Sequence, residues 1–350
     1  MKTFLRILLV LLLVIALAFG GLLGWLSATE FKPAPVEALE IRSLSSESAP
    51  VSAKELRSMS WNIGYAGLGA ESDFFMDGGK DSRPKDSDTV NRYLSGIRAA
   101  IEDEAPDLVL LQEVDLNSSR TYGIDETTSL LKNNAVHALN YSCPFVPIPI
   151  PPMGRVNSGL FTTTDFEIER AERISLPCPF SWPLRIANLK RCLLVSYLPV
   201  EGSDKHLVLV NLHLEAYDDG EGKIAQTRQL REFILDEYEK GNYVIAGGDF
   251  NQTFPGSLDA YPMLDPSFWT PGVLDDDLLS EGWRYAYDLT TPSCRLLNQP
   301  YDPADTEHTQ YYVIDGFILS PNVDLTSVTT LDCAFANSDH NPVSLLVDLK

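Results

Sequence analysis

A carboxylate and an amide stand two residues apart at the end of a short apolar run, in the stretch Tyr243-Val-Ile-Ala-Gly-Gly-Asp249-Phe-Asn251. Side chains at i and i+2 of an extended segment point the same way, so Asp249 and Asn251 can face one reacting centre. At such a centre a carboxylate can orient or deprotonate water, while an amide can hold an oxygen atom. The two glycines allow the backbone to approach a ligand closely. An ordinary turn contains the same residue types. Whether this stretch belongs to a functional site therefore depends on what the rest of the chain contains.

Polar side chains recur near the ends of several other expected strands. Asn211, His213 and Glu215 alternate with apolar residues, so all three project from one face of their strand. Polar groups in a framework rich in Val, Ile and Leu are costly unless they are paired or bound to something. The full set is Asn62, Glu113, Asn211, His213, Glu215, Asp249, Asn251, Asp315, Asp339 and His340.

Each of these residues has an ordinary structural explanation when it is taken alone. Asn62 is typical of a turn or a cap, and Glu113 of a protein surface. His213 by itself is more often a satisfied core histidine than a catalyst, and Asp315 can cap a turn. Coincidence fails as an explanation only because all of them follow the expected strands in one order along the chain.

The elements that must position these side chains alternate between strand-like and helix-like segments. Apolar residues recur with helical spacing over 90–101, and Ala105-Pro106 ends that helix. A second amphipathic helix is expected over 224–238. No linker-like break divides residues 53–350, so we predict one α/β domain of packed sheets flanked by helices. Its clearest expected strands are 108–111, 207–214, 243–249, 311–319 and 343–347.

An uninterrupted apolar run from Ile7 to Leu26 begins the chain, preceded by Lys2 and Arg6. A helix over residues 7–26 would span roughly 30 Å, the thickness of a hydrocarbon core. The positive charges before the run place the N-terminus in the cytoplasm and the rest of the chain outside the cell. We expect residues 1–27 to be an uncleaved, single-pass anchor in the cell membrane, because the sequence after Leu26 is a poor cleavage site. A cleaved signal peptide is the alternative, and the protein would then be secreted.

The segment that follows the apolar run, residues 28–52, is rich in Ser, Ala, Pro and Glu. This composition predicts a flexible tether with a reach of roughly 25–30 Å. The tether would keep the catalytic body near the outer membrane surface.

The formal net charge of −22 lies on residues 51–350, because residues 1–50 hold equal numbers of basic and acidic side chains. So acidic a surface repels polyanions and disfavours nonspecific nucleic-acid binding, although a divalent metal can invert the local field. The five cysteines have no CxxC spacing, so a zinc site is not expected, and their pairing and the oligomeric state stay open.

The ordered motifs resemble those of the endonuclease/exonuclease/phosphatase superfamily of metal-dependent phosphoesterases. They run from about residue 58 to residue 343, which is nearly the whole soluble body. The resemblance implies a four-layer α/β/β/α sandwich, here preceded by a transmembrane helix, with the site at one end of the two sheets. The matching motifs are Trp61-Asn62, Leu111-Gln-Glu113-Val, Asn211-Leu-His213-Leu, Gly248-Asp249-Phe-Asn251, Ile314-Asp315-Gly-Phe-Ile and Ser338-Asp339-His340.

The resemblance also implies a role for each residue. Asp249 would activate water, and Asp315 would hold His340 as an oriented, cationic imidazole beside the phosphate. His213 would protonate the leaving group or stabilise the transition state. The expected catalytic residues are therefore His213, Asp249, Asn251, Asp315 and His340; the expected substrate-binding residues are Asn62, Asn211 and Asn251; and the expected ligands of Mg²⁺ or Mn²⁺ are Glu113, Asn62 and Asp339.

The histidine at position 213 resembles the sphingomyelinase-like and pancreatic-deoxyribonuclease-like branches of the superfamily. Together with the expected anchor and the acidic body, it favours a phospholipid or another small phosphodiester as substrate. The apolar, proline-rich stretches 143–153 and 176–184 are either lipid-contacting or packed loops, and the loop Gly67–Asp86 is either a substrate lid or a surface loop. The alternatives are an extracellular nuclease, a phosphomonoesterase acting on inositol phosphates, and an inactive binding module on the same scaffold.

Overall fold

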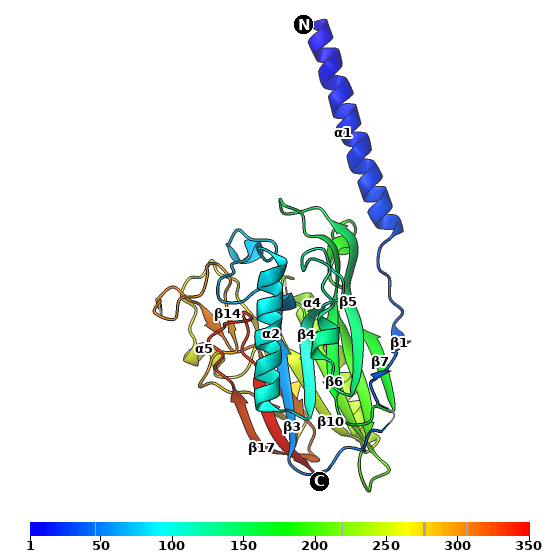
Figure 1. Ribbon diagram of the computed structural model, residues 1–350, viewed down its shortest axis with the longest axis vertical. Helices are drawn as coiled ribbons and strands as arrows, with labels where there is room; N and C mark the ends of the chain where they lie inside the picture. The colour runs from blue at the N-terminus through cyan, green and yellow to red at the C-terminus, as the bar shows by residue number, and fades with distance from the viewer. Residues whose placement is uncertain (46, 219, 276–277, 306) are drawn as a thin grey trace.

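Two seven-stranded sheets form the body of the computed structural model, which describes residues 1–45, 47–218, 220–275, 278–305 and 307–350 (Figure 1). The first sheet has the order β1 (Val36–Ala38), β7 (Arg170–Ser175), β8 (Cys192–Pro199), β9 (His206–His213), β10 (Tyr243–Asp249), β16 (Asp315–Leu319) and β13 (Arg284–Ala286). The second has the order β17 (Val323–Thr330), β18 (Val343–Leu349), β3 (Leu56–Asn62), β4 (Leu108–Asp115), β6 (Gly154–Thr164), β5 (Asn134–Val146) and β2 (Arg42–Ser43). Two smaller pairs join β11 (Gln252–Thr253) to β12 (Gly272–Val273) and β14 (Cys294–Arg295) to β15 (Tyr311–Tyr312).

Helices cover the outer faces of both sheets, which confirms the predicted α/β/β/α sandwich. The central strands read as continuous apolar runs because both of their faces are buried. In β4, Leu108 and Leu110 belong to the core between the sheets, whereas Val109 belongs to the core under α2 (Ser87–Glu104). On the other side, Leu230 and Ile234 of α4 (Glu221–Glu239) pack on the first sheet. The shorter helices are α3 (Glu126–Leu130), α5 (Ser257–Ala260) and the 3-10 turns η1 (Gly64–Ala66), η2 (Phe75–Asp77) and η3 (Leu184–Ala187).

Strand register brings the predicted polar side chains to one end of the sandwich. The pairs β3–β4 and β9–β10 are parallel, so the carboxyl ends of each pair meet at the same edge. Asp249 at the end of β10 lies opposite His213 on one neighbour and opposite Asp315 on the other.

Two of the expected strands differ from the sequence prediction. Glu113 was expected just past the end of its strand, but it lies inside β4, where an irregularity between Leu111 and Val114 gives it a φ of 54°. The single strand expected over 311–319 is interrupted into β15 and β16, with Asp315 as the first residue of β16. In both places the regular strand backbone is interrupted at a polar residue, so Glu113 and Asp315 depart from the alternation of side chains that a regular strand would have.

The two glycines before Asp249 serve packing within the sheet rather than the approach of a ligand. A Cβ atom on Gly248 would stand 1.9 Å from the carbonyl oxygen of Leu212 on β9. A Cβ atom on Gly247 would stand 2.3 Å from Cδ1 of Phe317 on β16. The structure therefore corrects the sequence interpretation of this pair.

Parts of the segment 28–52, expected to be a flexible tether, lie along the domain in this structure. β1 extends the first sheet beside β7, and β2 pairs with β5 in the second. Val51 is fully buried in the core between the sheets, and Leu39 and Ile41 pack against that core. Short edge strands need only backbone pairing and a few apolar side chains that anchor them. Their composition therefore resembles that of a flexible tether, which is why the sequence predicted one.

The helix α1 (Lys2–Ala28) is long and apolar, with a mean hydropathy of 2.9 over an 18-residue stretch, and projects from the body of the molecule (Figure 1). Its length and composition suit a membrane span, although a signal sequence near the N-terminus would satisfy the same criteria. The last turn contacts the domain, where Leu26 is buried and Trp182 Nε1 donates a hydrogen bond to Ser27 Oγ at 3.1 Å. Glu30, just beyond the helix, lies 3.1 Å from Arg185.

Candidate functional site

Asp315 and His340 form the predicted oriented pair. His340 Nδ1 lies 2.8 Å from Asp315 Oδ2, and the hydroxyl of Ser293 donates to the same oxygen at 2.8 Å. Burial by itself lowers the pKa of His340, but Asp315, followed by Cys294 and Asp339, outweighs it, so that the pKa lies well above its ordinary value. The imidazole is therefore cationic at neutral pH, and its Nε2 lies 3.9 Å from Asp339 Oδ2 and 4.0 Å from Asp249 Oδ2.

Asp249 occupies the centre of the site. Its Oδ2 lies 3.4 Å from His213 Nε2 and 4.0 Å from His340 Nε2, and it accepts a hydrogen bond from Asn62 Nδ2 at 3.0 Å. Burial, followed by repulsion from Asp315, raises the pKa of Asp249 to about 7. A carboxyl group that titrates near neutral pH can both accept and return a proton.

His213 is neutral at the pH where His340 is cationic. Burial, followed by the positive charges of Arg191 and His340, lowers the pKa of His213 well below its ordinary value. Its contact with Asp249 is therefore not an ion pair. Its Nδ1 atom is buried and has no hydrogen-bond partner among the described residues, which is unusual for a buried polar atom.

Asn62, Glu113 and Asp339 lie together on the wall of one cavity, as the sequence predicts for a metal site. Asn62 Nδ2 bridges Glu113 Oε1 at 3.3 Å and the carboxylate of Asp249. Burial, with added repulsion from Glu113, raises the pKa of Asp339 to about 6 although His340 opposes the shift. Acidic groups gathered in this way fit a hard divalent cation, which prefers oxygen ligands. Donor atoms also converge within 4.8 Å in the groups Asp249–Asp315–His340 and Cys294–Asp339–His340.

Asn251 does not continue the extended strand, as the i and i+2 argument had assumed. Its φ is 50°, its backbone N–H donates to Asp249 Oδ1 at 2.8 Å, and its Nδ2 donates to the carbonyl of Leu214 at 2.8 Å. Its side chain still lines the cavity. Left-handed backbone at a residue other than glycine costs of order 1–3 kcal/mol, and such strain gathers at functional sites. Glu113 and Tyr65 share this conformation at the same site.

Asn211, an expected substrate-binding residue, is not among the residues that line the cavity. Its Nδ2 donates to the carbonyls of Leu111 at 3.0 Å and Phe161 at 3.2 Å, and its Oδ1 accepts from Gln112 Nε2 at 2.8 Å. These partners belong to the opposite sheet, so Asn211 joins the two sheets beneath the site. The predicted alternation of polar residues along β9 is correct. However, Asn211 lies between the two sheets, whereas His213, two residues later, lines the cavity.

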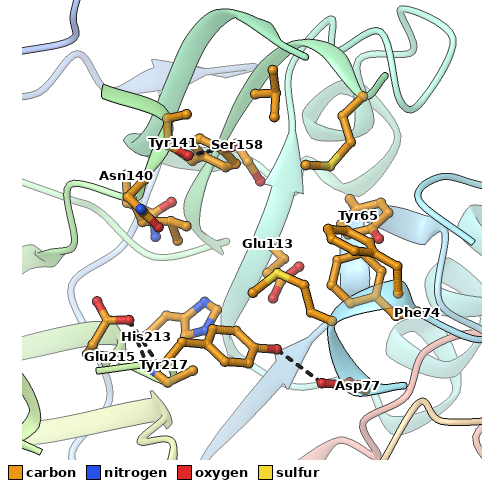
Figure 2. A pocket seen from close by; sticks show the side chains of 18 of the residues that line it. Tyr65, Phe74, Asp77, Glu113, Asn140, Tyr141, Ser158, His213, Glu215 and Tyr217 are labelled. Atoms are coloured by element: carbon orange, nitrogen blue, oxygen red, sulfur yellow. Dashed lines mark hydrogen bonds between the residues drawn. The ribbon is translucent and has the colours of Figure 1, made fainter. Parts of the chain in front are cut away.

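Sequence reasoning missed an interaction that crosses the cavity. Tyr217 OH donates to Asp77 Oδ1 at 3.3 Å, as Figure 2 shows. Asp77 belongs to the loop Gly67–Asp86, whose residues Phe74, Phe75 and Met76 also line the cavity. The loop therefore forms a wall of the site. The sequence showed an Asp-Gly-Gly turn in this loop but did not indicate that Asp77 would contact Tyr217.

A second missed feature is the pair of Arg191 and Glu215, both deeply buried. Arg191 Nε lies 3.4 Å from Glu215 Oε2, and Arg191 also donates to the carbonyl of His213 at 3.2 Å. Glu215 in turn accepts from the backbone N–H groups of Ala216 and Tyr217. The pair fixes the chain immediately after His213. Glu215 stood out in the sequence, but Arg191 lies in a loop with no periodic pattern.

The cavity that holds these groups has a volume of about 540 Å³. This lies within the range of roughly 300–1,000 Å³ that is usual for small-molecule sites. Glu113 projects into its centre, with His213 and the Tyr217–Asp77 pair around it (Figure 2).

Comparisons with known proteins agree with this fold. The model of the Endonuclease/Exonuclease/phosphatase family matches residues 59–340. A structure described as an endonuclease/exonuclease/phosphatase from Beutenbergia cavernae is 19% identical, covers 85% of this chain and 72% of its own, and has a TM-score of 0.54. The human Nocturnin catalytic domain with bound sulfate is 17% identical, with 89% and 98% covered and a TM-score of 0.51. A protein from Enterococcus faecalis, described as functionally unknown, is 14% identical, with 84% and 100% covered and a TM-score of 0.54.

These structures share the fold with this chain, and their identities are too low to transfer an activity. A search of curated proteins finds no match.

Proposed function

The chain belongs to the endonuclease/exonuclease/phosphatase family, and we propose that it is a membrane-anchored, metal-dependent phosphodiesterase. Enzymes of this family act on phosphoesters and generally use divalent metal ions. One observation carries the proposal for this chain: the Asp315–His340 pair stands beside Asp249 at the edge of a cavity that Glu113 and Asp339 also line.

The protein groups supply proton transfer and charge stabilisation. Asp249, with its pKa near 7, accepts the proton of the attacking water and holds the water in line with the phosphorus. His340, which Asp315 holds in position, places positive charge beside the phosphoryl oxygens. The neutral His213 donates a hydrogen bond to the leaving or phosphoryl oxygen.

Glu113 and Asp339 would hold Mg²⁺ or Mn²⁺. Asn62 would support these ligands, because its Nδ2 donates to Glu113 and Asp249 while its Oδ1 accepts from the N–H of Gly64 at 3.0 Å. When bound, the ion neutralises phosphate charge and stabilises the leaving oxygen. Burial, with a smaller contribution from the charge of Glu113, raises the pKa of Asp339, and a bound cation would favour its ionised form.

We place the catalytic domain outside the cell, with α1 crossing the membrane and the N-terminus in the cytoplasm. The apolar length of α1 and the positive charges of Lys2 and Arg6 support this orientation. A phospholipid, or another small phosphodiester at the outer membrane surface, is the proposed substrate.

The first test uses the full-length protein in detergent with a bis-aryl phosphate. We expect turnover with Mg²⁺ or Mn²⁺ that a chelator abolishes, and a loss of about 10²- to 10⁴-fold in Asp249→Ala and His340→Ala. His308→Ala is a matched control, because His308 also pairs with an aspartate, at 2.7 Å, but lies exposed outside the cavity. Metal-independent turnover, or full turnover in both site variants, would contradict the proposal.

The second test is a panel of sphingomyelin, phosphoinositides, plasmid DNA and RNA at equal enzyme concentration. We expect a lipid to be cleaved fastest. Preferential cleavage of DNA would replace the lipid proposal with a nuclease, and release of inorganic phosphate alone would indicate a phosphomonoesterase.

A further inference from the structure

The catalytic cavity is continuous with the membrane-facing end of the molecule. Its lining includes His213 and Asp249 and also Leu22, Leu23 and Leu26 from the last turns of α1. The helix would be roughly 40 Å long, so one that spans a hydrocarbon core of roughly 30 Å leaves these last turns at the outer leaflet. One cavity therefore has the reacting groups in one part of its wall and the anchor itself in another.

The wall beside α1 is apolar and belongs to two loops of the domain. Leu26 packs in one cluster with Val146, Met153 and Ile186. Val146 and Met153 flank the turn between β5 and β6, and Ile186 belongs to η3. Val146 and Met153 belong to the proline-rich stretch 143–153, and η3 begins at the last residue of the stretch 176–184, both of which the sequence left as either lipid-contacting or packed.

The tips of the same loops expose apolar side chains instead of burying them. Ile148 is 68% exposed and Ile150 is 91% exposed in the β5–β6 turn, and Leu184 is 66% exposed beside η3. The β5–β6 turn extends toward the end of the molecule from which α1 projects (Figure 1). Side chains of this kind beside a membrane helix lie at the depth of the interface and the first acyl carbons.

Polar contacts fix the helix against these loops, so the opening has a defined shape. The carboxylate of Glu30 is almost fully buried and lies 3.1 Å from Arg185 and 3.6 Å from Lys190. Trp182, from the same loop, donates to Ser27 at the helix end. These contacts join the segment after α1 to the loop, with the Glu30 carboxylate buried between two basic side chains.

We propose that the space between α1 and the loops 146–153 and 182–189 is an entry channel that holds an acyl chain, so that the enzyme takes a long-chain phosphodiester lipid directly from the outer leaflet. The inference rests on the proposed phosphodiesterase function and specifies its substrate class. The lipid tail stays against apolar side chains while the phosphate reaches Asp249 and His340. The exposed tips Ile148 and Leu184 enter the bilayer around the opening.

Binding is tested without turnover by a photoreactive lipid. Full-length protein in phosphatidylcholine vesicles, with residues 1–28 verified by mass, is irradiated with a phosphatidylcholine that carries a diazirine at the end of one acyl chain. We expect the cross-linked peptides to contain Met153 and Ile186, which line the cavity and are almost hidden from solvent. Cross-links confined to α1 would overturn the channel whatever the enzyme hydrolyses.

Selectivity is tested by the ratio of two rates in the same protein: kcat/KM for a long-chain phosphodiester lipid over kcat/KM for its water-soluble short-chain analogue. A charge at the bilayer-facing rim opposes insertion, so we expect Ile148→Glu and Leu184→Glu each to lower this ratio about ten-fold. Ile224→Glu is the matched control, because Ile224 is 60% exposed on α4 and does not line the cavity. It should leave the ratio unchanged.

The outcomes separate the channel from the chemistry. Wild-type protein that hydrolyses the short-chain analogue, but shows a ratio near one that no variant changes, would overturn the channel and leave the phosphodiesterase standing. Wild-type protein that hydrolyses neither substrate nor the bis-aryl phosphate would overturn the proposed function. Cross-links at Met153 or Ile186 would then still report a lipid-binding channel.

Discussion

At the scale of single residues, the hydrogen bond between Tyr217 and Asp77 places a titratable carboxyl on the wall of the cavity that Glu113 also lines. Burial raises the pKa of Asp77 to about 6, while the hydrogen bond from Tyr217 opposes the shift. The group is therefore neutral at pH 5 and negatively charged at pH 7.5. An anionic phosphodiester meets repulsion from Asp77 only in the upper part of this range.

Asp77→Asn removes this repulsion without changing the shape of the wall. We expect the ratio of KM for wild type to KM for Asp77→Asn to be near one at pH 5 and to rise about three- to ten-fold at pH 7.5. Taking the ratio at each pH cancels the titration of the groups that both proteins share. Asp204→Asn, at an exposed position, is the control. A ratio that does not vary with pH would contradict the assignment.

The site residues were predictable to the extent that strand ends are predictable. Asn62, Glu113, His213, Asp249, Asp315, Asp339 and His340 all meet, because each lies in or beside a strand that an apolar run predicts. Asn211 fails the prediction because two residues of strand span roughly 6.6 Å, enough to move a side chain from the cavity into the space between the sheets. Asp77 and Arg191 come from loops, whose sequences have no periodic pattern from which the direction of a side chain could be predicted.

Asn211→Ala separates a structural amide from a substrate ligand. The change leaves Gln112 and two backbone carbonyls without their partner inside the core. We expect the free energy of unfolding, measured by chemical denaturation, to fall by roughly 2–4 kcal/mol. His213→Ala should instead lower turnover with a smaller effect on stability. A rise in KM for Asn211→Ala at unchanged stability would return this residue to the substrate site.

At the scale of elements, the sequence predicts helices and central strands well and edge strands poorly. Elements that bury many side chains have long periodic or continuous apolar patterns, which are easy to recognise in a sequence. Examples are α2, α4, β4 and β9. β1 and β2 have three and two residues, and their sequence has the composition of a linker. Their position is decided by unpaired backbone groups on β7 and β5, which no local pattern reveals.

Two shortened chains test whether the segment 30–52 belongs to the domain. One begins at Glu30 and keeps β1, β2 and Val51, whereas the other begins at Ala53. Because the second exposes two sheet edges and the core contact of Val51, we expect it to melt about 10 °C lower than the first, or to aggregate. Equal melting temperatures would mean that the segment acts as a free tether after all.

At the scale of the whole molecule, the net charge of −22 governs which surfaces the protein can approach. The charge belongs to the domain, so a negatively charged bilayer repels the body that α1 would hold against it. At about 0.1 M salt this repulsion reaches roughly 10 Å. We expect a zwitterionic phosphodiester lipid to be hydrolysed faster in neutral vesicles than in vesicles with a third of anionic lipid. The difference should shrink at 0.5 M salt, and a rate indifferent to vesicle charge would argue against contact between body and bilayer.

The docking of Glu30 and of the segment after it has a kinetic consequence. A domain on a flexible tether moves through the solution near the membrane, and its rate follows the concentration of substrate in the bulk solution. Here the segment runs along both sheets and the end of α1 is fixed to the loops beside the cavity. Such a molecule moves with its patch of membrane and searches in two dimensions, so its rate should follow the mole fraction of substrate in the surface and stay constant when vesicles are diluted.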